Sequence, residues 1–369
     1  MRYYIVVGEA SGDIHGANLI KAIRAKDPQA EFRFFGGDKM QKSAETIATK
    51  HIRNLAFMGF WEVVKHLPTI FSNIALCKKD ILDFKPDAVI LIDYPGFNFR
   101  LFPFLKQHNF QTIYYISPQL WAWKKGRIKQ VKKYVDRLYV IFPFEVDFYR
   151  QQGVEAHYFG HPLLDEVDME NIAAAKNEKT IAILPGSRKQ EISYLFPEYL
   201  NVVKYFPDYK FKVAALSMNG EAFYRKFSLP ENVELVFDKT YDVLQMASVG
   251  IITSGTATLE TALFNVPQVI CYKGSWISYQ IAKRLIKGID FIGIVNLIAG
   301  KRVVEELIQH DVNEMRLVSE LKSLLQPETQ QRIKKDYEDL YKRLGNSGSS
   351  QRIADDLVSY LEKLDLHFR

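Results

Sequence analysis

A carboxylate stands at Asp93, directly after the apolar run 88–92 and two residues before Pro95. A carboxylate that leaves a buried strand for a crevice is partly desolvated, which raises its pKa and makes it a suitable general base. The residues that follow, Tyr94-Pro95-Gly96, equally fit a turn that Asp93 merely caps. From these residues alone both interpretations stay open.

A glycine-rich segment, residues 8–16, follows the first apolar run of the chain. Glycines allow a tight turn and a close approach to a ligand, and a helix N-terminus favours an anion or a polar acceptor. The spacing G-x-x-x-G-x-x-x-G does not match the dinucleotide fingerprint G-x-G-x-x-G. A tight turn with Ser11 or Asp13 as helix cap is the alternative. The candidate residues for a ligand in the cleft are Glu9, Ser11, Gly12 and Asp13.

Two later loops, around residues 186 and 255, contain the residue types of a phosphate site. In each, a Gly-Ser or Ser-Gly turn follows an apolar run and precedes a predicted helix, where backbone N–H groups can bind an anion. Glu260 could accept both hydroxyls of a ribose, or could complete a capping box. Together the loops favour a nucleoside diphosphate, and no P-loop, D-x-D pair or His/Cys cluster indicates ATP hydrolysis or a metal. The candidate donor residues are Gly186, Ser187, Arg188, Ser254, Gly255, Thr256, Thr258 and Glu260.

Tryptophans beside basic residues are typical of a segment at a membrane surface. The segment contains Trp121, Trp123, Lys125, Lys129 and Lys132, and the three lysines are expected on one helical face. A solvated basic helix is the alternative. The apolar stretch 58–71 serves either core packing or an acyl-chain pocket. Its candidate residues are Met58, Phe60 and Trp61.

The candidate residues named above must be positioned by regular secondary structure. Along the chain, short apolar runs alternate with helix-length segments. Such runs, rich in β-branched and aromatic residues, indicate βαβ units and parallel sheets, in which ligands bind beyond the carboxyl ends of the strands. Two doubly wound α/β domains that face each other across a cleft are expected, over residues 1–165 and 166–350, with a closing helix from residue 351 that returns to the first. The predicted strands are residues 3–7, 31–35, 88–92, 112–116, 137–142, 180–184, 211–215, 233–237, 249–253 and 268–272.

Composition agrees with a two-domain globular protein. The chain has 369 residues, of which 47% are hydrophobic and 25% charged, whereas a domain is usually about 150 residues long. The two cysteines have no C-x-x-C partner, which excludes a zinc ribbon and favours a reducing compartment. No signal peptide or membrane-spanning run is expected, and a net charge of +6 allows a phosphate-bearing partner or an anionic membrane without requiring either.

The motifs also resemble those of the lipid-A-disaccharide synthases. The matching segments keep their order from about residue 5 to residue 310. The most specific of them are Gly8-Glu9-Ala10-Ser11-Gly12-Asp13 and Trp121-Ala122-Trp123. All the matching segments are Gly8-Glu9-Ala10-Ser11-Gly12-Asp13, Ser117-Pro118, Trp121-Ala122-Trp123, Pro143-Phe144-Glu145, Gly160-His161-Pro162, Leu184-Pro185-Gly186-Ser187-Arg188, Ser254-Gly255-Thr256-Ala257 and Asn296-Leu297-Ile298-Ala299-Gly300.

The resemblance implies an inverting glycosyltransferase of the GT-B fold at the cytoplasmic face of the inner membrane, to which it would bind peripherally. Such enzymes join UDP-2,3-diacylglucosamine to 2,3-diacylglucosamine 1-phosphate (lipid X), which gives the β-1,6-linked disaccharide 1-phosphate and UDP. It implies Asp93 as the base for the acceptor hydroxyl, Arg188 beside the diphosphate and Asn296 near the donor. No metal, other cofactor or nucleic acid is expected.

The chain departs from the family at Gly96, where members commonly carry a second aspartate. That leaves open whether Asp93 works with its usual neighbours. The resemblance also allows a homodimer in which carboxyl-terminal parts are exchanged. Two other functions remain alternatives: a different enzyme that uses UDP-sugars, such as a UDP-N-acetylglucosamine 2-epimerase, and a non-enzymatic protein that binds anionic surfaces.

Overall fold

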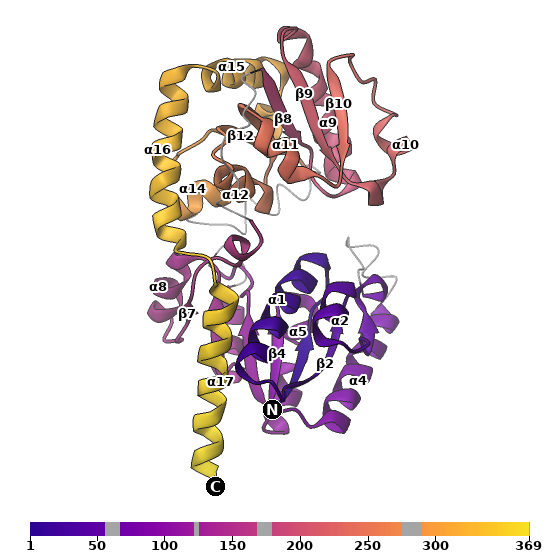
Figure 1. The fold of residues 1–369 in the computed structure, drawn as a ribbon, viewed down its shortest axis with the longest axis vertical. Coiled ribbons are helices and arrows are strands. Elements are labelled where there is room, and N and C mark those ends of the chain that lie inside the picture. The colour runs from indigo at the N-terminus through magenta and orange to yellow at the C-terminus, as the bar shows by residue number, and fades with distance from the viewer. Residues whose placement is uncertain (56–66, 122–124, 168–178, 275–289, 369) are drawn as a thin grey trace. The chain divides into compact units, whose positions relative to one another are not determined.

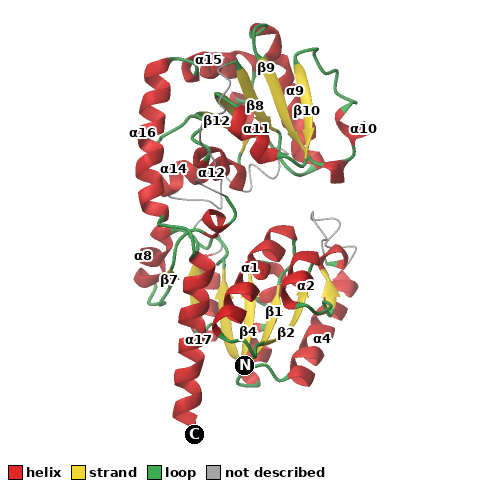
Figure 2. Cartoon of the chain, viewed as in Figure 1, coloured by secondary structure: helices red, strands yellow, loops and turns green. Residues whose placement is uncertain are grey.

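The structure, a computed structural model, describes residues 1–55, 67–121, 125–167, 179–274 and 290–368. The chain forms two compact units, one made of Met1–Glu166 together with Gly345–Arg369 and the other of Val167–Leu344. Each unit is an α/β layer structure with its own sheet, shown in yellow in Figure 2. The polar, alanine-containing segment 165–179 is predicted to be a linker and helix between the domains, and most of it lies outside the described residues.

The sheet of the first unit has seven strands, all parallel, in the order β3-β2-β1-β4-β5-β6-β7. The chain builds outward from β1 to β3 and then returns to the other side of β1 with β4, so the strand order reverses between β1 and β4. The strands are β1 (Arg2–Val6), β2 (Glu31–Gly36), β3 (Lys50–His51), β4 (Ala88–Ile92), β5 (Gln111–Tyr115), β6 (Arg137–Val140) and β7 (His157–Tyr158).

Helices cover both faces of this sheet, which is why its strands are apolar along their whole length. Tyr3 and Ile5 of β1 pack on one face with α1 and α2, while Tyr4 and Val6 pack on the other with α4, α6, α7 and α8. The helices are α1 (Ala10–Lys26), α2 (Asp38–Ala44), η1 (Ile52–Asn54), α4 (Leu67–Phe84), α5 (Pro95–Asn98), α6 (Phe102–Gln107), η2 (Lys125–Arg127), α7 (Ile128–Tyr134), α8 (Pro143–Gln151) and η3 (Pro162–Asp165).

The closing helix α17 (Ser349–Phe368) belongs to the first unit. Its apolar face, which includes Leu357 and Leu361, joins the core beside α1, and Figure 1 shows it in yellow along that unit. Asp165 caps its first turn, accepting hydrogen bonds from the backbone N–H groups of Gly348 (2.6 Å) and Ser350 (2.8 Å). The chain therefore leaves this unit and returns to it at neighbouring points.

The second unit contains a six-stranded parallel sheet in the order β10-β9-β8-β11-β12-β13, with the reversal between β8 and β11. Its strands are β8 (Thr180–Leu184), β9 (Lys210–Ala215), β10 (Val233–Phe237), β11 (Val249–Thr253), β12 (Gln268–Tyr272) and β13 (Glu306–Ile308). Its helices are α9 (Lys189–Asn201), η5 (Val203–Tyr205), η6 (Ser217–Asn219), α10 (Glu221–Tyr224), α11 (Thr240–Met246), α12 (Thr256–Leu263), α14 (Ile294–Ala299), η7 (Gln309–Asp311), α15 (Glu314–Leu324) and α16 (Pro327–Leu344).

All ten predicted strands are confirmed, five of them with the predicted bounds. The strands β3, β7 and β13, which have two, two and three residues, were not predicted. A run that short has no measurable periodicity, and it becomes a strand only because a neighbouring strand offers it a free edge.

Candidate active site

Asp93 lies at the point where the strand order of the first unit reverses. It directly follows β4, whose partner strand β1 leads into the glycine-rich segment, so both loops leave the same edge of the sheet. In open α/β sheets this is where ligands bind. The two segments are therefore neighbours in space, because β1 pairs with β4.

The backbone around Asp93 is held in an unusual conformation. Asp93 has φ 45° and Tyr94 has φ 46°, a left-handed geometry that costs energy for residues other than glycine. Three hydrogen bonds hold it: the Asp93 N–H donates to the Tyr115 carbonyl (3.0 Å), and the Asp93 carbonyl accepts from Asn98 Nδ2 and the Tyr114 hydroxyl (both 2.7 Å). With its backbone tied on both sides, Asp93 keeps its carboxylate in one place.

The environment of the Asp93 carboxylate raises its pKa. Burial and the negative charge of Glu9 raise its pKa to about 6, against an opposing hydrogen bond from the Tyr94 N–H and the charge of His15. A carboxyl group with a pKa of about 6 is a much stronger base than an exposed aspartate, yet it is still ionised at neutral pH. That is the balance a general base needs.

The glycine-rich segment provides both exposed polar groups and structural ones. Glu9 is the residue before α1 and accepts a hydrogen bond from Ser11 Oγ (2.9 Å), and both face solvent at least in part. Gly8 has no room for a side chain because the ring of Tyr94 packs against it. Gly12 is buried against Val7.

Asp13 has a structural role in this unit. It is buried, and its carboxylate accepts hydrogen bonds from the backbone N–H groups of Gly37 (2.6 Å), Lys39 (3.0 Å) and Met40 (3.2 Å). These are the unpaired donors at the start of α2, so Asp13 caps that helix, not its own as the alternative interpretation expected. Both carboxylate oxygens of Asp13 therefore accept hydrogen bonds from inside the protein.

The basic aromatic segment is only partly described. Trp121 Nε1 donates to Glu145 Oε1 (3.2 Å), and burial raises the pKa of Glu145 to about 8. Lys129 and Lys132 are exposed on α7, whereas residue 125 lies before that helix, in η2, so the three lysines do not share one regular helix as predicted. The candidates outside the described residues are Met58, Phe60, Trp61 and Trp123, together with the side chain of Lys125.

In the second unit the two predicted phosphate loops leave neighbouring strands at the strand-order reversal. Gly186 follows β8 with φ 101°, and Gly255 follows β11 with φ 150°, conformations that glycine adopts without strain. A side chain on Gly255 would meet no atom within 4 Å, which leaves its backbone open to a ligand. The loops precede α9 and α12, whose N-termini carry partial positive charge.

The side chains of these loops that reach solvent are hydroxyls and one guanidinium. Ser187 and Thr256 are exposed, and Ser254 Oγ makes a long hydrogen bond to the Ile292 carbonyl (3.4 Å). Arg188, the residue before α9, is 61% exposed, and its Nη1 lies 3.2 Å from Glu191 Oε1. An exposed arginine with one carboxylate partner can exchange that partner for a phosphate.

Thr258 and Asn296 support the loops from inside. Thr258 Oγ1 is buried and donates to the Gly255 carbonyl (2.8 Å). Asn296 is fully buried, and its amide accepts from the N–H groups of Val303 (2.8 Å) and Val304 (3.1 Å) and donates to Glu306 Oε1 (2.8 Å). The hydrogen bonds of both side chains lie within the second unit. Glu260 lies one turn into α12 and is partly exposed.

Three contributors to the surroundings of Asp93 were not predicted: Asn98, Tyr114 and His15. Asn98 lies only five residues after Asp93, so its proximity was a usable signal. Tyr114 and His15 come from other elements, β5 and α1, and only the folded chain brings them close.

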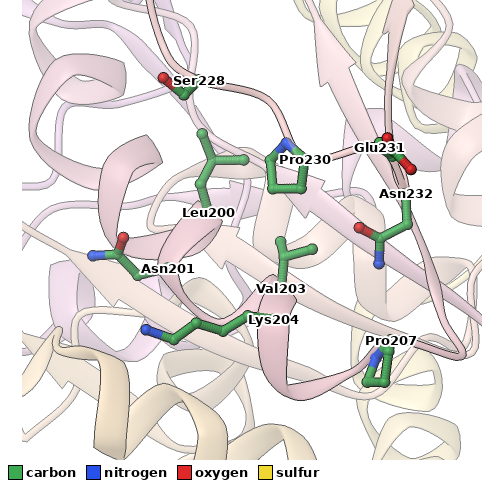
Figure 3. A pocket seen from close by; sticks show the side chains of 9 residues that line it. All are labelled: Leu200, Asn201, Val203, Lys204, Pro207, Ser228, Pro230, Glu231 and Asn232. Atoms are coloured by element: carbon green, nitrogen blue, oxygen red, sulfur yellow. The ribbon is translucent and has the colours of Figure 1, made fainter.

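A hollow of about 500 Å³ in the second unit lies away from these loops. Figure 3 shows its lining, which includes Lys204, Pro230 and Asn232. The lining segments lead into the N-terminal ends of β9 and β10, whereas the phosphate loops follow the C-terminal ends of β8 and β11. None of the predicted site residues lines this hollow.

Two kinds of feature are absent from the described residues. No helix in the described ranges is both long and apolar enough to cross a bilayer. Within the same residues, no three His, Cys, Asp or Glu side chains gather in a way that could hold a metal ion.

Comparison with solved structures shows that this arrangement is a known fold. A Staphylococcus aureus MnaA–UDP co-structure matches with a TM-score of 0.67 and 12% identity, and covers 98% of this chain and 97% of that one. Spinosyn rhamnosyltransferase SpnG matches with a TM-score of 0.59 and 12% identity, over 98% of this chain and all of the other. Other matches are UDP-N-acetylglucosamine 2-epimerases at 11–13% identity. At these identities the likeness is one of fold, and it confirms two parallel-sheet α/β domains of the GT-B kind.

Sequence comparison separates the predicted functions. The family model described as "Lipid-A-disaccharide synthetase" matches residues 3–357. The lipid-A-disaccharide synthase of Geobacter sulfurreducens is 37% identical over 378 residues, and that of Geobacter metallireducens is 38% identical, each covering 98% of both chains. These matches favour the predicted transferase over the epimerase and over the non-enzymatic protein. The chain belongs to the lipid-A-disaccharide synthase family.

Proposed function

We propose that this chain transfers 2,3-diacylglucosamine from UDP-2,3-diacylglucosamine to the 6-hydroxyl of lipid X, with inversion at the anomeric carbon. The products are the β-1,6-linked disaccharide 1-phosphate and UDP. One observation carries the proposal: in a member of a glycosyltransferase family, Asp93, a carboxyl group with a pKa of about 6, stands at the switch point of the first sheet.

The first unit would bind the acceptor and activate it. Asp93 removes the proton from the acceptor hydroxyl as the oxygen attacks, and its tied backbone keeps the carboxylate aligned during that step. Glu9 and Ser11 present polar groups at the same edge and are suited to hydrogen-bond the hydroxyls of the acceptor sugar. Asp13 and Gly12 would support this loop from within.

The second unit would bind the UDP part of the donor. As the glycosidic bond breaks, negative charge grows on the leaving diphosphate, and Arg188 and the N-termini of α9 and α12 offset it. Ser187 and Gly255 are exposed for phosphate contacts, Gly186 with its φ of 101° would shape the first loop for the same contacts, and Glu260 is suited to the ribose hydroxyls. Thr258 and Asn296 would keep these loops in shape.

The acyl chains and the membrane are assigned to the aromatic and basic segments. Met58, Phe60, Trp61, Trp121 and Trp123 would give apolar cover to the acyl chains. Lys125, Lys129 and Lys132 would meet anionic headgroups, so the protein would bind the cytoplasmic face of the inner membrane peripherally. A homodimer with exchanged carboxyl-terminal parts is part of the same proposal.

A turnover assay tests the reaction. Purified protein is mixed with UDP-2,3-diacylglucosamine and lipid X in detergent, with EDTA present and no added metal, and UDP and the disaccharide are followed. We expect UDP release that requires both substrates. UDP release from the donor alone, or conversion of UDP-N-acetylglucosamine in the absence of lipid X, would contradict the proposal.

Membrane binding is tested by reversing charge on the basic segment. Changing Lys125, Lys129 and Lys132 to Glu is expected to weaken binding to vesicles that contain anionic lipid by about 10-fold or more, because each basic residue near such a surface contributes about 1 kcal/mol. Cosedimentation measures the bound fraction. The control changes three exposed lysines of the second unit, Lys226, Lys322 and Lys335, to Glu. Equal loss in both triple variants would contradict the assignment.

A further inference from the structure

Tyr94, the residue after Asp93, has a backbone conformation that is rare for a bulky side chain. Its φ of 46° and ψ of 51° lie in the left-handed region, and it is the N-cap residue of α5. Such strain persists only where neighbouring groups fix the residue, and it is concentrated at active sites. The contacts of the Tyr94 side chain therefore bear on how the Asp93 turn is held.

The ring of Tyr94 lies on the glycine-rich segment. Strands β1 and β4 pair with Val6 opposite Leu91, so Gly8 and Asp93, two residues further along each strand, leave the same edge of the sheet. A Cβ on Gly8 would overlap the ring atoms Cγ, Cδ1 and Cδ2 of Tyr94. The ring therefore rests on the Gly8 backbone, and a residue with a side chain at position 8 would displace it.

Two more contacts fix the orientation of this ring. It stacks on Phe97 of α5, with 5.3 Å between the ring centroids and 17° between the planes. The Tyr94 hydroxyl donates a hydrogen bond to the carbonyl of Leu55 (3.3 Å). Phe97 and Leu55 are both buried in the core of the first unit. Together with Gly8, they hold the ring from three separate segments of the chain.

The backbone of Tyr94 supports the groups that hold Asp93. Its carbonyl accepts hydrogen bonds from the N–H groups of Phe97 (3.1 Å) and Asn98 (3.0 Å), which begins α5. Asn98 is fully buried, and its Nδ2 donates to the Asp93 carbonyl (2.7 Å). A ring that fixes Tyr94 therefore also fixes the helical turn whose Asn98 side chain holds the Asp93 backbone.

We propose that Tyr94 is a positioning residue for the reaction: its ring, seated on Gly8, locks the turn that carries Asp93 to the glycine-rich segment. The base and the polar groups that would hold the acceptor sugar then keep one arrangement, as catalysis by proximity requires. The proposal rests on the proposed function, because it takes Asp93 as the general base and places the acceptor at this segment. It goes beyond that function in assigning the alignment of the two segments to an aromatic ring.

The first test removes the ring with Tyr94→Gly, since glycine adopts the left-handed backbone without strain. We expect kcat to fall about 10- to 100-fold, because a reacting group displaced by about 1 Å loses rate on that scale. The KM for UDP-2,3-diacylglucosamine and the UDP affinity, which depend on the second unit, are expected to stay at their wild-type values. Tyr94→Phe keeps the ring and is expected to retain most of the activity. Unchanged kcat in Tyr94→Gly, or an equal loss in Tyr94→Phe, would overturn the proposal.

The second test approaches the same contact from Gly8. The methyl group of Gly8→Ala would overlap the Tyr94 ring, so kcat is expected to fall in this variant too. In the double variant Gly8→Ala/Tyr94→Gly the ring is absent, and kcat is expected to equal that of Tyr94→Gly alone. Two changes that remove one shared contact are not additive, whereas changes at independent sites are. Fully additive losses in the double variant would overturn the proposal.

The control is Tyr134→Ala. Tyr134, at the end of α7, is also a partly buried tyrosine that packs on this face of the sheet, and its ring stacks on Phe102 with 6.0 Å between the centroids. Its loss is expected to lower the thermal midpoint and to leave kcat unchanged at temperatures where the protein is folded. If Tyr94 served only the stability of the fold, Tyr94→Gly would behave in the same way, which would overturn the proposal.

Thermal midpoints separate a failure of this proposal from a failure of the proposed function. Gly8→Ala is expected to lower the midpoint of the wild type more than that of Tyr94→Gly, because only the wild type has a ring for the methyl group to displace. Retained activity in Asp93→Asn would overturn the proposed function, and the midpoints would still decide whether the ring of Tyr94 joins the two segments. Equal lowering by Gly8→Ala in both backgrounds would overturn the proposal itself.

Discussion

Replacing Asp93 by asparagine is expected to lower kcat by about 10²–10⁴-fold, the usual contribution of a general base, while UDP binding stays at the wild-type level. The amide occupies the same space but cannot take the proton of the acceptor hydroxyl. Initial rates with saturating substrates measure kcat, and calorimetric titration of UDP measures binding. Unchanged kcat in Asp93→Asn would remove this residue from the chemistry.

The variant should fold well. Asparagine tolerates the left-handed conformation that Asp93 adopts, and the carbonyl that accepts from Asn98 and Tyr114 is unaffected. Because the folded-state pKa of Asp93, about 6, lies above the reference value of 3.8, ionising Asp93 destabilises the fold as the pH rises from about 4 to 6, and the loss is complete above 6. Above pH 6 the thermal midpoint of Asp93→Asn is therefore expected to equal or exceed that of the wild type.

The same pKa predicts the pH profile of the wild type. The carboxylate must be ionised to act as a base, so kcat/KM is expected to fall below a midpoint near pH 6. Asp147→Asn is the matched control, because Asp147 is an exposed aspartate of the same unit that pairs with Arg150 on the surface. It is expected to change neither kcat nor the profile.

Replacing Arg188 by alanine is expected to lower kcat/KM by about 10²–10³-fold, the size of effect seen when one group that stabilises a developing negative charge is removed. The helix N-termini of the second unit would still stabilise the negative charge of the leaving UDP, but its only proposed cation would be lost. UDP affinity is expected to fall as well, because the same guanidinium would bind the diphosphate before the reaction. Arg188→Lys is expected to recover part of the activity, since lysine keeps the charge but not the planar fork.

Arg225→Ala is the control for Arg188→Ala. Arg225 is 67% exposed and pairs with Glu221, whereas Arg188 is 61% exposed and pairs with Glu191, so both lose one surface ion pair of the same unit. Such pairs contribute about 0–1 kcal/mol, and both variants should fold. Equal activity in the two variants would contradict a role for Arg188 at the diphosphate.

Much of the fold could be predicted because its signals are local. Strands such as residues 88–92 and 249–253 are continuous apolar runs, and that pattern reports burial on both faces of a sheet. The two-residue strands β3 and β7 could not be predicted, because their strand character comes from pairing with β2 and β6. The closing helix was predicted from residue 351 and begins at Ser349, where Asp165, distant in sequence, caps its N-terminus.

The residues of the candidate site also fall into those that could be predicted from the sequence and those that could not. Asp93 and Arg188 could be proposed from their places after strands. The roles of Asp13 and Asn296 could not be read from their types, since the same groups that bind ligands also bind backbone N–H groups. Only the folded chain shows that Asp13 caps α2 and that Asn296 holds residues 303–304.

The sequence by itself determined the class of fold, the family and the residues that could carry the reaction, because apolar periodicity and strand-end motifs are properties of short segments. Only the tertiary structure decided which polar side chains form hydrogen bonds inside the protein and how strong a base Asp93 is. Burial, Glu9 and His15 set that strength. The physical reason is that desolvation and charge act through distances of a few ångströms, which depend on packing between β4, β5 and α1 and not on spacing along the chain.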